Sequence, residues 1–103
     1  MTTHILFVED EPRGVQPYFR ELERNGFSCY LAESGDQAIR KLRYHKFDAI
    51  SMDIMFAPGP AMGAQVDETE AGLHLLEMIR QHKMKNCSPE LPVIVLTAVT
   101  NID

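Results

Sequence analysis

Three carboxylates and one hydroxyl in this sequence each follow a short apolar run: Glu9, Asp10, Asp53 and Thr97. Such runs are typical of strands that are buried on both faces of a parallel sheet. Because the carboxyl ends of parallel strands meet at one edge of the sheet, these four side chains are predicted to lie close together.

Carboxylates gathered in this way favour phosphoryl chemistry assisted by a metal ion. They repel one another and raise each other's pKa unless a cation lies between them. Hard oxygen ligands that leave room for water and phosphate suit Mg²⁺. A carboxylate beside such a cation can attack phosphorus and form an acyl phosphate, while the cation neutralises charge on the transferring group. A threonine hydroxyl at a neighbouring strand end can donate to a phosphoryl oxygen.

The elements that must position these side chains are strands alternating with helices. Strands are predicted over residues 5–8, 27–32, 49–53 and 93–96. This alternation predicts an α/β fold with a doubly wound parallel sheet, in a flavodoxin-like three-layer αβα arrangement with right-handed crossovers. In such a sheet the ligand site lies at the carboxyl ends of the strands, near the switch in strand order.

The first two helices have recognisable starts. Apolar residues at helical spacing run from Val15 to Leu22, and the helix is predicted to begin close to Pro17. The reason is that a proline inside a helix costs about 3 kcal/mol. Ser34 and Gln37 form a capping box at the start of the second helix.

The third helix is predicted to begin with acidic residues. Asp67, Glu68 and Glu70 suit its first turn, where negative charge meets the positive end of the helix dipole. The helix is then expected to run through Leu73, Leu76, Ile79 and Arg80.

Composition restricts the class of protein. Hydrophobic residues make up 45% of the 103 residues and charged residues 24%, as in one globular domain. No apolar run is long enough to span a membrane, and the net charge of −5 disfavours direct binding of nucleic acid. Cys29 and Cys87 form neither a disulfide framework nor a metal pair by spacing, and Cys87 is expected in an exposed loop. A cytoplasmic protein without membrane contacts is predicted.

Three stretches of the sequence, in their order and spacing, resemble the CheY-like receiver domain of bacterial two-component response regulators. They are residues 5–12 (ILFVEDEP), 47–53 (FDAISMD) and 93–98 (VIVLTA). Each stretch alone is a weak signal, but together they are specific, and the resemblance covers essentially the whole chain.

The resemblance implies a role for each candidate residue. Asp53 would be the phospho-accepting aspartate. Glu9, Asp10 and Asp53, with the backbone carbonyl of Met55, would hold Mg²⁺, and Thr97 would be the switch hydroxyl that contacts the phosphoryl group. A phosphohistidine on a sensor histidine kinase or phosphotransfer protein would be the donor in this phosphorelay. Such a domain is not an enzyme, because it assists only its own aspartyl phosphorylation and dephosphorylation, and its output is a change in partner binding.

The chain departs from the family pattern in two places. That pattern continues through a fifth strand, which ends in Lys-Pro, and a final helix, whereas this chain stops at Asp103 with every lysine before Thr97. Residues 1–103 are therefore expected to form a C-terminally truncated receiver domain that either dimerises through its open sheet edge or exposed face or is a fragment of a longer protein. The helix-starting glycine, Gly72, lies nineteen residues after Asp53. This spacing indicates an insertion at about residues 57–68, as either a spacer or a regulatory element.

Other functions remain as alternatives. A pseudo-receiver would keep the fold as an interaction or dimerisation module without depending on phosphorylation. A haloacid-dehalogenase-like phosphatase would need a second aspartate two residues after the nucleophile, where this chain has Met55. A flavodoxin-type electron carrier would need a Gly/Ser/Thr-rich phosphate cradle in the first loop, which here is acidic.

Overall fold

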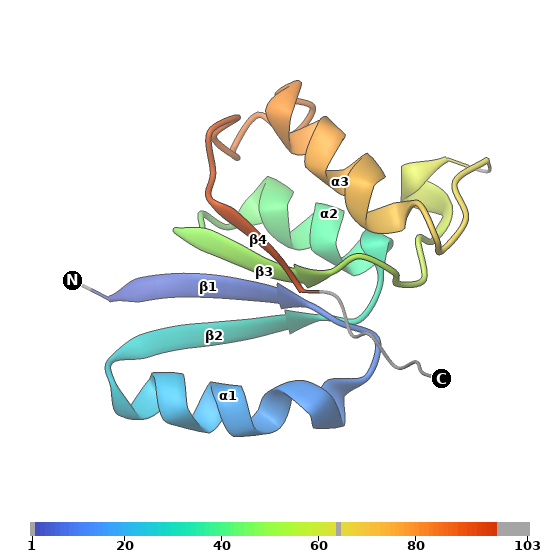
Figure 1. The fold of residues 1–103 in the computed structure, drawn as a ribbon. Coiled ribbons are helices and arrows are strands. Elements are labelled where there is room, and N and C mark those ends of the chain that lie inside the picture. Colours follow the sequence, from blue (N-terminus) through green and yellow to red (C-terminus); the bar gives the residue numbers. More distant parts are fainter. Residues whose placement is uncertain (1, 64, 97–103) are drawn as a thin grey trace.

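A computed structural model describes residues 2–63 and 65–96 of the chain (Figure 1). Its strands are β1 (Thr3–Val8), β2 (Phe27–Ala32), β3 (Ala49–Asp53) and β4 (Val93–Leu96). Its helices are α1 (Pro12–Arg24), α2 (Gly35–Tyr44), α3 (Ala71–Arg80) and a short 3₁₀ helix, η1 (Pro60–Met62). The predicted alternation of strands and helices is confirmed, and β1 begins two residues earlier than its apolar run.

The strands form one parallel sheet in the order β2-β1-β3-β4. The chain thus builds outward from β1 in both directions, as expected for a doubly wound sheet. Val8 is paired with Met52 across β1 and β3, so the residues that follow the two strands emerge side by side. The strand order changes direction between β1 and β3, and this switch point is where the acidic residues lie.

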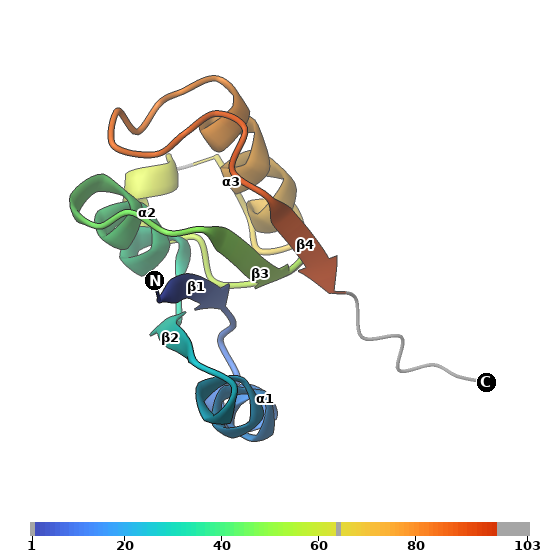
Figure 2. The same ribbon diagram turned by 90° about the vertical axis from the view of Figure 1, so that its left-hand side faces the viewer.

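The two faces of the sheet carry different helices. Figure 2 shows α1 alone on one face and both α2 and α3 on the other. The main apolar core lies on the α2/α3 face, where side chains of the central strands pack against both helices. Its largest fully buried members are Phe56, Leu6, Ile39, Leu42, Ile50, Met52, Leu75, Ile79, Met84 and Val8.

The prediction that α1 begins near Pro17 is wrong. The helix starts at Pro12, and Pro17 lies inside it. Pro12 fits the first helical turn, where a missing N–H costs nothing. Pro17 is exposed, so the backbone carbonyl it leaves without a helical partner can bind water, while the buried Val15 holds this part of the helix on the sheet. Packing against the sheet therefore outweighs the local cost of the proline.

Helix α2 begins as its capping sequence predicts. The Gln37 backbone N–H donates to Ser34 Oγ at 3.2 Å. The Gln37 side chain reaches one residue beyond the cap and accepts from the Glu33 backbone N–H at 2.8 Å. Both bonds satisfy backbone donors at a helix start, where no intrahelical acceptor exists.

The start of α3 differs from the sequence prediction. The acidic residues precede the helix instead of forming its first turn, which contains none. Asp67 Oδ1 accepts from the Thr69 hydroxyl at 2.5 Å and from the Thr69 backbone N–H at 2.9 Å. The hydrogen bond from the Thr69 hydroxyl is the main reason that the pKa of Asp67 is lowered. Leu73, expected on the apolar face, is exposed, and Leu75 takes the core position.

Cys87 is buried, contrary to the expectation of an exposed loop position. It lies between α3 and β4 with 6% of its surface exposed and belongs to the main core. Arg80 fixes this connection, because its guanidinium donates to the carbonyls of Pro89 at 2.9 Å and Leu91 at 2.8 Å. Burial then raises the pKa of the Cys87 thiol.

Within the described part of the chain, no helix has the length and apolar character needed to cross a membrane.

Candidate functional site

The carboxyl ends of β1 and β3 bring three acidic side chains together. Glu9 directly follows β1, and its backbone N–H donates to the Ala32 carbonyl at 2.9 Å, which extends the β1–β2 pairing by one residue. Asp10 comes next in the turn toward α1. Asp53 is the last residue of β3. The buried apolar strands thus carry the three carboxylates to one edge of the sheet.

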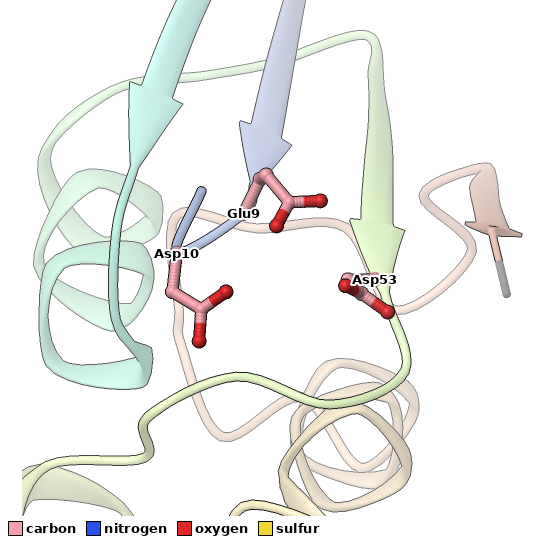
Figure 3. Close-up of side chains that lie close together, drawn as sticks. All are labelled: Glu9, Asp10 and Asp53. Atoms are coloured by element: carbon pink, nitrogen blue, oxygen red, sulfur yellow. The ribbon is translucent and has the colours of Figure 1, made fainter. Parts of the chain in front are cut away.

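One carboxylate oxygen from each of Glu9, Asp10 and Asp53 lies within 4.8 Å of the other two. Figure 3 shows the three side chains around the space between the ends of β1 and β3. Glu9 and Asp53 are partly buried, and Asp10 is exposed. The predicted convergence of these three acids is therefore present in the structure.

The effect of the acidic cluster is seen at Glu9, whose pKa is raised. Burial is the main reason that the pKa of Glu9 is raised. The negative charges of Asp53 and Asp10 raise this pKa further, against the opposing effect of the Glu11 backbone N–H, which donates to Glu9 Oε1 at 3.1 Å. A cation among these oxygens would remove the repulsion.

The donor set fits a small hard cation. Mg²⁺ binds oxygen ligands at about 2.0–2.1 Å, so ligands on opposite sides of the ion lie roughly 4 Å apart. Neighbouring ligands of an octahedral ion lie roughly 3 Å apart, so the three carboxylate oxygens, within 4.8 Å of one another, would draw closer together around it. Such an ion commonly keeps several waters, and the exposure of Asp10 leaves room for them.

The other two predicted site residues are Met55 and Thr97, and the structure describes only the first of them. The Met55 backbone N–H donates to Asp53 Oδ1 at 3.4 Å, so the chain turns tightly after the strand and keeps this residue beside the carboxylate. The role of the Met55 carbonyl as a metal ligand stays a prediction. Thr97 lies outside the described residues, and so does its predicted contact with a phosphoryl group.

The connection from β3 to α3 is folded against both neighbouring helices. Phe56, three residues after Asp53, is fully buried. The Gly72 backbone N–H donates to the Ile54 carbonyl at 3.0 Å. A Cβ on Gly72 would lie 2.6 Å from that oxygen, so only glycine permits this close approach. This contact explains why a glycine stands at the start of α3. It joins Gly72 to the residue after Asp53, so the insertion between them does not change the requirement.

Residues 57–63, called the strap below, are hydrogen-bonded to the start of α2. The Gly35 backbone N–H donates to the Ala57 carbonyl at 2.7 Å, and the Ala61 N–H donates to Asp36 Oδ1 at 2.6 Å. Met62 is buried at Gly35, where a Cβ would lie 2.2 Å from the Met62 sulfur. Sequence reasoning did not identify Gly35 and Asp36 as anchors, because their partners are more than twenty residues away.

A profile of the response regulator receiver domain matches residues 5–103. The chain belongs to this family. Among its curated relatives are the alkaline phosphatase synthesis transcriptional regulatory protein PhoP of Bacillus subtilis (strain 168) and the response regulator MprA of Mycobacterium sp. (strain KMS). Each is 30% identical to this chain over 95% of its length. This chain spans only 34% and 36% of the length of these relatives, respectively.

Solved receiver structures resemble this one in fold. The receiver domain of a sensor histidine kinase from Pseudomonas aeruginosa PAO1, with a magnesium ion coordinated in its active-site cleft, is 28% identical with a TM-score of 0.69. The similarity covers 95% of this chain and 69% of that one. TrrA from Thermotoga maritima, in complex with Mg²⁺ and a beryllium fluoride, is 28% identical with a TM-score of 0.67, over 95% of this chain and 71% of its own. This receiver domain is therefore a signalling module of the two-component type.

Proposed function

We propose that this receiver domain accepts a phosphoryl group on Asp53 from a phosphohistidine of a sensor histidine kinase or phosphotransfer protein. The observation that supports it most is the acidic cluster, in which Glu9, Asp10 and Asp53 offer oxygens within 4.8 Å of one another at the switch point of the sheet. Among structurally similar receiver domains, magnesium and beryllium fluoride complexes are known.

In this proposal each residue has a distinct role. An oxygen of Asp53 attacks phosphorus, the bond from phosphorus to the donor's imidazole nitrogen breaks, and its electron pair stays on that nitrogen. Glu9 and Asp10, with Asp53 and the carbonyl of Met55, hold Mg²⁺. When bound, the ion would neutralise charge on the transferring group. Thr97 donates its hydroxyl to a phosphoryl oxygen.

The output of the domain is a change of surface that alters partner binding. Support comes from the connection after Asp53, which is attached to both helices on one face of the sheet. The Ile54 carbonyl accepts from Gly72 in α3, and the Ala57 carbonyl accepts from Gly35 in α2. A doubly charged group on Asp53 therefore acts on a segment that contacts both helices.

Intact mass tests the acceptor role directly. The protein is incubated with a small acyl phosphate donor and Mg²⁺, beside an Asp53→Asn variant and a sample with chelator. We expect the mass of one added phosphoryl group in the wild-type protein alone. A gain of equal size in Asp53→Asn would refute the assignment of the acceptor.

Thermal unfolding with and without Mg²⁺ tests the metal role. The melting temperature of the wild-type protein should rise with Mg²⁺, because the ion binds only the folded cluster. Asp10→Asn should lose most of this rise, whereas Glu11→Gln should keep it. Glu11 is the matched control, since it is an exposed neighbouring acid outside the cluster. Equal responses of the two variants would exclude the proposed ligand set.

The alternative is a pseudo-receiver, an interaction module that works without phosphorylation. The folded strap favours this alternative, because it gives the domain a built surface that does not involve the acidic cluster. A folded protein that gains no phosphoryl mass, yet binds its partner equally well as wild type and as Asp53→Asn, would support it.

A further inference from the structure

A groove of about 360 Å³ runs between α2 and the strap, outside the acidic cluster. One wall is the exposed side of α2 and the other is η1. Figure 1 shows η1 as the short yellow helix that precedes α3. The residues that matter for binding are Ile39, Arg40, Arg43, Tyr44, Pro60 and Ala61.

The strap wall of this groove is held in place by the protein itself. Asp36, in the first turn of α2, accepts from the Ala61 N–H at 2.6 Å. Gly59 has a φ of 76° and lies so close that an added Cβ would be 2.4 Å from the Asp36 carboxyl carbon. The groove is therefore a formed feature of the fold, and Asp36 is already engaged by a backbone donor within it.

The rim of the groove is basic, although the whole chain carries a net charge of −5. Arg40 and Arg43 are three positions apart, so both lie on the same side of α2, and both are exposed. Within residues 2–63 and 65–96, neither guanidinium takes part in a hydrogen bond or salt bridge of the structure. Arginine guanidinium groups favour carboxylates, which they bind with two parallel hydrogen bonds.

The lining of the groove combines polar and apolar surface. Its accessible apolar surface comes from the exposed Pro60 and Ala61 on the strap side, while Ile39 beneath them is almost fully buried. Tyr44 leaves 74% of its surface exposed at the end of α2, and such a ring combines an apolar face with a polar hydroxyl. This combination suits an apolar side chain flanked by carboxylates.

We propose that the groove between α2 and the strap binds an acidic peptide segment of a partner protein. An apolar side chain of the segment lies over Pro60 and the Tyr44 ring, and carboxylates of the segment pair with Arg40 and Arg43. The proposal does not depend on phosphorylation of Asp53, so it is tested with the unphosphorylated domain.

Fluorescence anisotropy of a labelled short peptide, with glutamates around a single leucine, provides the test. The double variant Arg40→Glu/Arg43→Glu should bind about tenfold more weakly or worse, because repulsion replaces two charge-assisted contacts. Arg20→Glu is the matched control: it makes the same charge change at an exposed position of α1, on the other face of the sheet, and should bind like wild type. Arg40→Gln/Arg43→Gln should weaken binding by a smaller factor.

Three results would overturn the proposal. The first is equal loss of binding in Arg20→Glu and the double variant, which would indicate a general charge effect. The second is equally tight binding of a peptide whose leucine is replaced by glycine, which would show that the apolar part of the lining does not contribute to binding. The third is equally tight binding of an oligonucleotide of matched charge, since an unspecific polyanion site would then explain the result. Circular dichroism of every variant establishes that the fold is intact.

Discussion

In the part of the chain that the structure describes, the α2/α3 face of the sheet is closed, whereas the α1 face is partly open. On the first face, two helices, the strap and the connection before β4 bury a continuous set of apolar side chains. On the second, α1 leaves an apolar groove of about 560 Å³ beside β1, β3 and β4. Ile94 borders this groove with 57% of its surface exposed, while Ile79 in α3 is fully buried.

This difference places the core and the segment that follows the proposed phosphorylation site on the same face. The core that stabilises the domain lies under α2 and α3, and the segment after Asp53 attaches to both of these helices. In the proposed function, a phosphoryl group on Asp53 would therefore act on the face that contains the core. Closely packed interiors have discrete arrangements and do not deform smoothly, which suits a switch.

The largest expected change in stability comes from truncating a buried side chain on the closed face. Ile79→Ala should lower the free energy of unfolding by about 2–5 kcal/mol, because it removes transfer free energy and leaves a cavity. Ile94→Ala on the open face should cost less than about 1 kcal/mol, since most of that side chain already contacts water. Urea denaturation monitored by circular dichroism measures both. Equal costs would show that the two faces do not differ in packing.

Two glycine-to-alanine substitutions, one on each side of the sheet, should change the stability of the domain in opposite directions. Gly35→Ala should destabilise the domain by about 1–3 kcal/mol, because the new Cβ would lie 2.4 Å from the Pro58 carbonyl oxygen. Gly14→Ala in α1 should stabilise it by roughly 0.5–1 kcal/mol, because nothing lies within 4 Å and alanine favours the helix. Thermal melts of the two variants give the signs, and a stabilising Gly35→Ala would contradict the strap contact.

The rates at which the two cysteines react with a thiol reagent should differ between the two faces, which is a smaller effect than the changes in stability. Cys29, beside α1, is partly exposed, and Cys87 is buried on the other face. Burial is the main reason that the pKa of each thiol is raised, and Glu23 adds to the effect at Cys29. A thiol-specific reagent should label Cys29 before Cys87 in the folded protein.

Both labelling rates should rise with pH, because the thiolate is the form that reacts and both thiols keep their protons to a pH above the usual range. Single Cys→Ala variants assign each rate, and faster labelling of Cys87 would contradict its burial.

The raised pKa values of the two thiols also make the folding stability depend on pH. A thiol whose pKa is higher in the folded than in the unfolded state favours folding at neutral pH. This contribution is lost as the pH rises through the raised pKa. Alkaline destabilisation should therefore be smaller in the Cys→Ala variants than in the wild-type protein.

Local patterns were sufficient for the strands and for the identity of the acidic residues. Continuous apolar runs predicted β1 and β4, and less regular stretches rich in apolar residues predicted β2 and β3, because strands of a buried parallel sheet are mostly apolar. The alternation with helices then placed Glu9, Asp10 and Asp53 at one edge. The capping pair Ser34 and Gln37 predicted the start of α2 for the same local reason, since a side chain satisfies a backbone donor three residues away.

The features that the sequence did not predict all depend on contacts between distant segments. Pro17 stays within α1 because Val15 packs on the sheet, and Cys87 is buried because the segment before β4 folds over the core. Spacing indicated the insertion at about residues 57–68 but not how it folds; the strap is positioned by Gly35 and Asp36, which precede it by more than twenty residues. Sequence periodicity reports on one element and its immediate neighbours. Which segments lie beside each other is decided by sheet register and by packing, and these exist only in the folded chain.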